Sequence, residues 1–192
     1  MQHWQTSGEA SISTWYGEVP RRVMQAAEQI KLLVCDVDGV FSDGQVYLGN
    51  DGEELKAFHT RDGFGVKALL NAGIEVAVIT GRRSRIVENR MQALGVTHIV
   101  QGCDDKFPVY QQLQQQLGLQ SQQVACIGDD IPDAPMIADC GLGVAVYDAH
   151  PWVQQQASYV TNIAGGRGAV RELSDLILLA QGKLHDAQGA SV

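Results

Sequence analysis

Short apolar runs separated by helix-compatible segments constrain the fold more than any other feature of this sequence. Residues 30–37 form an apolar run that is too short for a helix, which indicates a strand buried on both faces. Alternation of such strands with helices predicts parallel pairing through right-handed crossovers. We therefore expect an α/β fold, doubly wound around a mainly parallel sheet. Further strands are expected at residues 74–79, 98–100, 124–127 and 142–146, and helices at about 20–29, 63–71, 83–94, 107–117, 132–138 and 171–181.

Residues 45–58 interrupt this alternation. Apolar residues flank the turn sequence Gly49-Asn50-Asp51-Gly52, a pattern that predicts a β-hairpin projecting from the sheet. The 192 residues suffice for one domain with a full core, and no linker or internal repeat is visible. We expect a single domain over residues 1–192, with polar, flexible tails at 1–19 and 183–192.

Charge and hydropathy exclude several classes of function. The 22 acidic residues outnumber the 14 basic ones, and a formal charge of -8 without a basic run disfavours nucleic acid and anionic lipid as partners. No apolar stretch approaches the roughly 20 residues that a membrane span needs, and no secretory signal is recognisable, so we expect a cytoplasmic protein. The four cysteines lack a Cys-x-x-Cys pair, which favours reduced thiols over disulfides or zinc.

Chemically active side chains gather where the predicted strands end. In a parallel sheet these carboxyl ends meet along one edge, which is where ligands bind. Two acids at positions i and i+2, as in Asp36-Val37-Asp38-Gly39, are weak evidence alone, because calcium loops share the pattern. A calcium loop is excluded here, because its twelfth position would be Tyr47. The conjunction carries the prediction: Asp36, Asp38, Thr80, Lys106, Asp129 and Asp130 all follow strands or open a helix beside them.

These segments, taken in order, resemble the four motifs of the haloacid dehalogenase superfamily: Asp36-Val37-Asp38-Gly39-Val40, Ile79-Thr80-Gly81-Arg82, Lys106, and Gly128-Asp129-Asp130-Ile131-Pro132-Asp133. The resemblance implies a Mg²⁺-dependent phosphatase in which Asp36 is the nucleophile and Asp38 the general acid and base. It implies that Thr80 and Lys106 stabilise the phosphoryl group. It also implies that Mg²⁺ is bound by the side chains of Asp36 and Asp129 and the main-chain carbonyl of Asp38. Asp130 and Asp133 would orient Lys106 and outer-shell water.

The sequence leaves no room for the cap domain that many of these phosphatases carry. Only the hairpin, one helix and one strand fit between Asp38 and Thr80, so a lone monomer would have an open site. Residues 36–64 and 163–172 resemble the capless subfamily of 3-deoxy-D-manno-octulosonate 8-phosphate (KDO 8-phosphate) phosphatases. That resemblance implies a homotetramer in which a neighbouring subunit covers each site. It also implies a role in lipopolysaccharide precursor synthesis, and a substrate pocket lined by Asp38, His59, Thr60, Arg61, Asp62, Gly63, Lys67, Arg82, Arg90 and Lys106.

Several alternatives remain open at this stage. Cations at Arg61, Lys67, Arg82 and Arg90 would suit a phosphorylated sugar acid, but such residues also decorate solvated helix faces. Gly165-Gly166 is either a flexible turn or, with Arg167, a segment that seals a neighbour's pocket. An acylneuraminate 9-phosphate phosphatase and a noncatalytic oligomerising scaffold are the competing functions, and the scaffold is disfavoured because every motif is intact.

Overall fold

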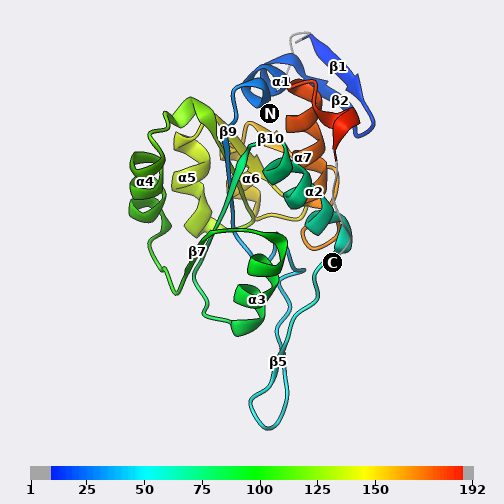
Figure 1. Ribbon diagram of the computed structural model, residues 1–192. Coiled ribbons are helices and arrows are strands. Elements are labelled where there is room, and N and C mark those ends of the chain that lie inside the picture. The colour runs from blue at the N-terminus through cyan, green and yellow to red at the C-terminus, as the bar shows by residue number, and fades with distance from the viewer. Residues whose placement is uncertain (1–9, 188–192) are drawn as a thin grey trace, which may run out of the picture.

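The centre of the molecule is a six-stranded sheet in the order β10-β9-β8-β3-β6-β7 (Figure 1). The computed structural model describes residues 10–187, and every pairing in this sheet is parallel. The predicted doubly wound α/β fold is therefore confirmed. The strands are β3 (Leu32–Cys35), β6 (Glu75–Thr80), β7 (His98–Gln101), β8 (Val124–Gly128), β9 (Leu142–Ala145) and β10 (Tyr159–Val160).

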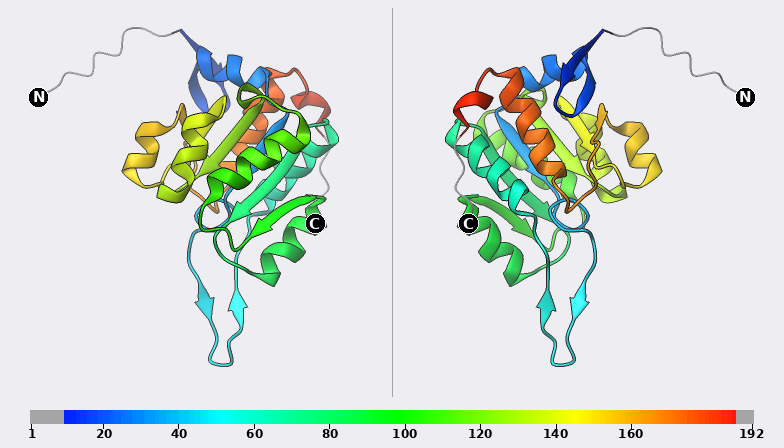
Figure 2. Two further views of the ribbon diagram at one scale, coloured as in Figure 1. Left: turned by 90° about the vertical axis from the view of Figure 1, so that its left-hand side faces the viewer. Right: turned by 90° about the vertical axis from the view of Figure 1, so that its right-hand side faces the viewer.

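Helices cover both faces of the sheet (Figures 1 and 2). On one face lie α1 (Arg21–Glu28), α2 (Thr60–Asn71) and α7 (Ala169–Ala180), and α7 packs against the other two. On the opposite face lie α4 (Lys106–Leu117) and α5 (Ala134–Asp139). The remaining helices are α3 (Arg85–Leu94) and α6 (Pro151–Gln156). With both faces covered, all four residues of β3 are fully buried, as its apolar sequence predicts.

Strand β3 holds the position that matters most for function. The chain leaves β3 toward β6 on one side and later returns to place β8 on its other side. Such a switch in direction opens a crevice beyond the carboxyl ends of the strands. The residues that follow β3 and β8 therefore face each other across this crevice.

The predicted hairpin is present as β4 (Tyr47–Leu48) and β5 (Glu54–Leu55), and it extends well beyond the body of the molecule (Figure 2). Tyr47, Leu48 and Leu55 expose large apolar side chains on it. Between Asp38 and Thr80 the chain forms only this hairpin, α2 and β6, and between Thr80 and Lys106 only α3 and β7. No cap domain is present within residues 10–187.

The ends of the chain differ from the prediction. Residues 11–19, expected in a flexible tail, form together with Pro20 an antiparallel hairpin of β1 (Ser11–Thr14) and β2 (Gly17–Pro20) that packs on α1. Residues 183–187, also expected to be flexible, include a turn of 3₁₀-helix at Leu184–Asp186. The remaining parts of both predicted tails, 1–9 and 188–192, lie outside the described residues. The sequence prediction also missed β10 and α6, because both are shorter than the windows in which periodicity is recognisable.

Candidate active site

Asp36 follows β3 directly and lies at the floor of a cavity of about 340 Å³. The side chain is buried, and the Asp36 backbone N–H donates to Ile127 of β8, which extends the sheet by one residue. All the predicted catalytic and metal-binding residues line this cavity. Its walls are Asp36, Asp38, Thr80, Gly81, Arg82, Cys103, Asp104, Lys106, Asp129, Asp130, Pro132 and Asp133.

Lys106 reaches Asp36 from the first turn of α4. Asp105 caps this helix by accepting from the Phe107 N–H, and the buried Lys106 side chain extends between two carboxylates. Lys106 Nζ lies 2.8 Å from Asp36 Oδ1 and 2.7 Å from Asp133 Oδ1. Burial acts to lower the pKa of Lys106, but the charges of Asp36 and Asp133 outweigh it and raise that pKa. Lys106 therefore stays cationic beside Asp36.

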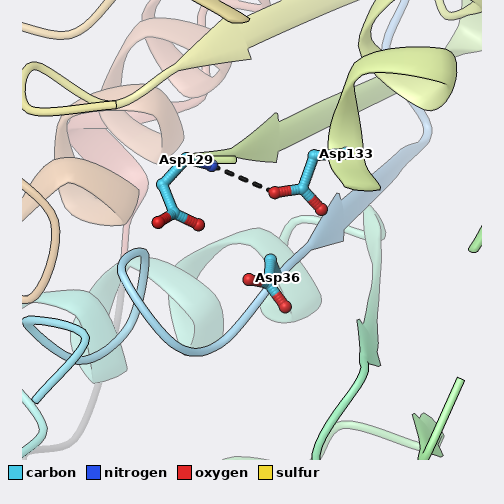
Figure 3. Close-up of side chains that lie close together, drawn as sticks. All are labelled: Asp36, Asp129 and Asp133. Carbon is cyan, nitrogen blue, oxygen red and sulfur yellow. Dashed lines mark hydrogen bonds between the residues drawn. The ribbon is translucent and has the colours of Figure 1, made fainter. Parts of the chain in front are cut away.

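Asp133 supports the site rather than facing the cavity with free oxygens. Its Oδ1 accepts from Lys106, and its Oδ2 accepts from the backbone N–H groups of Asp129, at 3.1 Å, and Asp130, at 3.3 Å. Figure 3 shows the bond from Asp129. The Asp130 side chain points away to cap the following 3₁₀ turn by accepting from Ile131. Asp133 thus orients Lys106, as predicted, while Asp130 shapes the loop after β8.

Three carboxylates, those of Asp36, Asp129 and Asp133, place oxygen atoms within 4.8 Å of one another (Figure 3). Burial, followed by repulsion from Asp133, raises the pKa of Asp36 to about 6 despite Lys106. Burial, followed by repulsion from Asp36 and Asp133, raises the pKa of Asp129 to about 8. The cluster holds more negative charge than one lysine can neutralise, so it is suited to a cation.

The free oxygens of this cluster fit a divalent metal ion. Buried Asp36 Oδ1 approaches Lys106 but lacks the alignment of a hydrogen bond, and the Asp129 carboxylate accepts no hydrogen bond among residues 10–187. Gly39, at φ +91°, passes so close beneath Asp129 that a Cβ would overlap the carboxylate. Carboxylate oxygens are the hard ligands that Mg²⁺ prefers. Asp36 and Asp129 are therefore the two side chains available to bind it.

Asp38 stands at the cavity wall with its side chain about one-fifth exposed. Lys56, at the base of the hairpin, donates to Asp38 Oδ1, and Arg82 Nε lies 3.9 Å from Oδ2. Lys56 is a site residue that the sequence reasoning missed, because it lies in the hairpin and outside every recognised motif. The only indication of Lys56 in the sequence was its place directly after Leu55, in the second half of the predicted hairpin.

Thr80 and Arg82 both line the cavity as predicted, but in different ways. Thr80 ends β6 and is buried, whereas the Arg82 side chain is half exposed and pairs with Glu54 of the hairpin at 3.4 Å. The rim of the cavity is thus formed partly by the hairpin.

The other predicted substrate-binding residues do not line this cavity. His59 is the N-cap of α2 and accepts from the Arg61 N–H. The helix predicted at residues 63–71 therefore begins earlier, at Thr60. Buried Asp62 accepts from the Arg171 N–H and so holds the N-terminus of α7. The Arg90 guanidinium lies against Gly63. The cavity of the single chain therefore excludes His59, Thr60, Arg61, Asp62, Gly63, Lys67 and Arg90 from its walls.

The loop that contains Gly165 and Gly166 packs on residues 39–43, in the loop that follows Asp36 in the same chain. A Cβ at Gly165 would overlap the carbonyl oxygen of Gly39, and a Cβ at Gly166 would overlap the backbone of Ser42 and Asp43. The Gly166 N–H donates to Val40. The two glycines therefore permit backbone-to-backbone contact behind Asp36, which favours neither of the two roles left open by the sequence.

The fold and this site, with one lysine among carboxylates at the ends of parallel strands, define a haloacid dehalogenase-like hydrolase. A sequence profile described as haloacid dehalogenase-like hydrolase matches residues 98–173. The 3-deoxy-D-manno-octulosonate 8-phosphate phosphatase of Yersinia pestis is 55% identical over 97% of this chain and 100% of its own length. The chain belongs to the family of 3-deoxy-D-manno-octulosonate 8-phosphate phosphatases.

Solved structures agree with this assignment. The crystal structure of the Yersinia pestis phosphatase superposes with a TM-score of 0.94 and covers 96% of this chain and 100% of that one. The Moraxella catarrhalis phosphatase, solved in complex with a magnesium ion, a phosphate ion and KDO, is 42% identical. It superposes with a TM-score of 0.84 over 85% of this chain and 94% of that one. None of the helices in residues 10–187 is long and apolar enough to span a membrane.

Proposed function

We propose that this protein is a Mg²⁺-dependent phosphatase that hydrolyses KDO 8-phosphate to KDO and inorganic phosphate. The observation that carries the proposal is the contact of Lys106 with both Asp36 and Asp133 beside the free carboxylate of Asp129. This is a site for a phosphate group, whose negative oxygens need positive charge next to the attacking carboxylate. The high identity to phosphatases of KDO 8-phosphate supports the choice of substrate.

In the first step, Asp36 attacks phosphorus and forms an aspartyl-phosphate as the bond to the sugar oxygen breaks. Asp38 gives its proton to that oxygen, so the sugar leaves as a neutral alcohol. In the second step, Asp38 takes a proton from water, which attacks the aspartyl-phosphate and releases phosphate. Lys106 and the Thr80 hydroxyl, both on the cavity wall, stabilise the oxygens of the transferred group.

Asp36 and Asp129 would bind Mg²⁺ through their side chains, and Asp38 through its main-chain carbonyl. When bound, the ion supplies positive charge that offsets the repulsion between the carboxylates and the phosphate. The raised pKa values of Asp36 and Asp129 support this role, because burial, followed by repulsion between neighbouring carboxylates, disfavours their charged forms when no cation is bound. The magnesium ion in the Moraxella catarrhalis complex is consistent with the choice of metal.

The carboxylate of the sugar acid requires cations beyond those that bind phosphate. Arg82 is on the cavity rim and is the first candidate. We propose that His59, Thr60, Arg61, Asp62, Gly63, Lys67 and Arg90 contribute to substrate binding only through a homotetramer, in which a neighbouring subunit covers each open site. Asp62 and Gly63 are buried within their own subunit, so their contribution would be to shape the surface and not to touch the substrate. We also propose a cytoplasmic role in lipopolysaccharide precursor synthesis.

Phosphate release from KDO 8-phosphate, with and without Mg²⁺, tests the proposal. We expect Mg²⁺-dependent turnover that Asp36→Asn removes without loss of fold. Retained turnover in that variant would disprove the nucleophile assignment. A higher kcat/KM for N-acylneuraminate 9-phosphate would favour the nine-carbon alternative, and a folded oligomer without any phosphatase activity would favour a scaffold.

A further inference from the structure

Lys56 contacts the site, but it lies outside the superfamily motifs and has no role in the proposed mechanism. It follows β5 directly, at the base of the projecting hairpin, and its side chain is fully buried. Burying an ammonium group costs several kcal/mol unless it is paired, so a lysine in this position calls for a specific partner. Lys56 Nζ contacts Asp38 Oδ1 and lies 3.6 Å from Glu54 Oε1.

The contacts of Asp38 distinguish its two carboxylate oxygens. Oδ1 accepts from Lys56 and, at 3.4 Å, from the Ser42 hydroxyl. Oδ2 accepts no hydrogen bond among residues 10–187, and its one charged neighbour there, Arg82 Nε, is 3.9 Å away. Two donors on Oδ1 fix the rotation of the carboxylate, and Oδ2 is left as the oxygen that can exchange a proton.

Four ionisable side chains meet around this point. Lys56 and Arg82 each contact both Asp38 and Glu54. The network links the hairpin to the end of β3 and the end of β6. Its geometry is consistent with a group that holds a catalytic carboxyl group in place, because each of the two carboxyl groups is contacted by the same two cationic side chains.

We propose that Lys56 is a positioning residue for the general acid, a role that rests on the phosphatase function proposed above. By holding Oδ1, Lys56 directs Oδ2 toward the ester oxygen of the substrate. As the phosphorus–oxygen bond breaks, the proton on Oδ2 passes to the departing sugar oxygen, and Asp38 becomes an anion beside the Lys56 ammonium. General acids of this kind contribute about 10² to 10⁴-fold in rate, and they lose that contribution when they are misplaced.

The test is the dependence on the leaving group in single turnover, with enzyme in excess. KDO 8-phosphate needs a proton on its leaving oxygen, whereas p-nitrophenyl phosphate does not. We expect Lys56→Met to slow release of KDO by about 30 to 100-fold and release of p-nitrophenolate by less than about threefold. Lys31→Met, the same change at an exposed lysine beside β3, should alter neither rate.

Each other outcome decides against the role. Equal slowing of the release of both leaving groups would indicate loss of packing. A raised KM for KDO 8-phosphate at an unchanged rate would indicate that Lys56 binds substrate. Unchanged rates would remove Lys56 from the mechanism. If Lys56→Met does not fold, Ser42→Ala is the second variant, because it removes the other donor to Asp38 Oδ1. It should slow KDO release by about three to tenfold and leave p-nitrophenolate release unchanged. If Ser42→Ala slows both releases equally, or slows neither, the proposal is overturned. Failure of the phosphatase function itself would appear separately, as a wild-type protein that leaves KDO 8-phosphate intact.

Discussion

Lys106 Nζ lies 2.8 Å from Asp36 Oδ1, and this ion pair joins the end of β3 to the start of α4 inside a buried site. The same lysine pairs with Asp133, so one cation contacts two carboxylates from two different loops. Each of the three buried charged groups therefore needs the others to offset the free-energy cost of its burial.

Lys106→Met should therefore lower stability as well as activity. Removing one partner of a buried charge network costs about 3–5 kcal/mol, because the remaining carboxylates are left unpaired. Urea-induced unfolding without Mg²⁺ would measure the free energy of unfolding. Adding Asp36→Asn to Lys106→Met should recover part of the loss, and strict additivity of the two changes would contradict the coupling.

Magnesium affinity should increase with pH. Burial and the neighbouring carboxylates raise the pKa of Asp129 to about 8, so at pH 6 a metal ion must displace its proton. We expect the dissociation constant to fall by up to about tenfold per pH unit between pH 6 and 8, which calorimetry at several pH values would measure. Asp129→Asn should weaken binding and flatten this dependence, whereas a wild-type affinity independent of pH would contradict it.

Asp62→Asn should change how stability depends on pH. Burial raises the pKa of Asp62 to about 6 despite the Arg171 N–H, so the folded protein retains a proton that the unfolded chain has released. The charged form is the disfavoured one, and wild type should lose stability relative to the variant as pH rises from about 4 to above 6. The change is at most about 3 kcal/mol, and unfolding at pH 4.5 and 7.5 would measure it. A difference that does not vary with pH would show that Asp62 titrates normally.

Gly166→Ala should disturb the loop that follows Asp36. The added Cβ would overlap the backbone of Ser42 and Asp43, and φ at this position is +66°. Gly182→Ala is a matched control, because its φ is +67° and a Cβ added there would meet no atom within 4 Å. Both variants should lose about 1 kcal/mol from backbone strain, but Gly166→Ala should lose at least as much again and reduce kcat. Equal effects of the two substitutions would show that the contact behind Asp36 is unimportant.

The sequence predicted the parts of the site that follow from strand periodicity. One cavity is lined by Asp36, Thr80 and Asp129, because parallel strands end along one edge of the sheet. This rule can be applied to a sequence without any interatomic distance. Lys56 and the Gly165-Gly166 contact were not predictable in this way, because both depend on segments far apart in the chain that meet only in the folded state. The contact of Asp62 was not predictable for the same reason, because its partner is the backbone of Arg171 in α7.

The N-terminal hairpin and the pair of α6 and β10 were missed for a local reason. Each element is six residues or shorter, and its burial pattern is set by neighbours and not by its own sequence. Residues 11–20 mix polar residues with a few apolar ones and form no long apolar run, yet they pair as strands over α1, where tertiary contact outweighs local preference.

The way α7 closes the molecule also affects how the protein is made. Strand β3 is synthesised early and its neighbour β8 only after residue 123, while the loop of Gly165 and Gly166 and the helix held by Asp62 emerge from the ribosome near the end. A nascent chain therefore leaves one edge of the apolar β3 unpaired until β8 has been made, and unpaired strand edges of this kind are prone to aggregate. Truncation within the last helix would yield a substrate for proteolysis instead of a weaker enzyme.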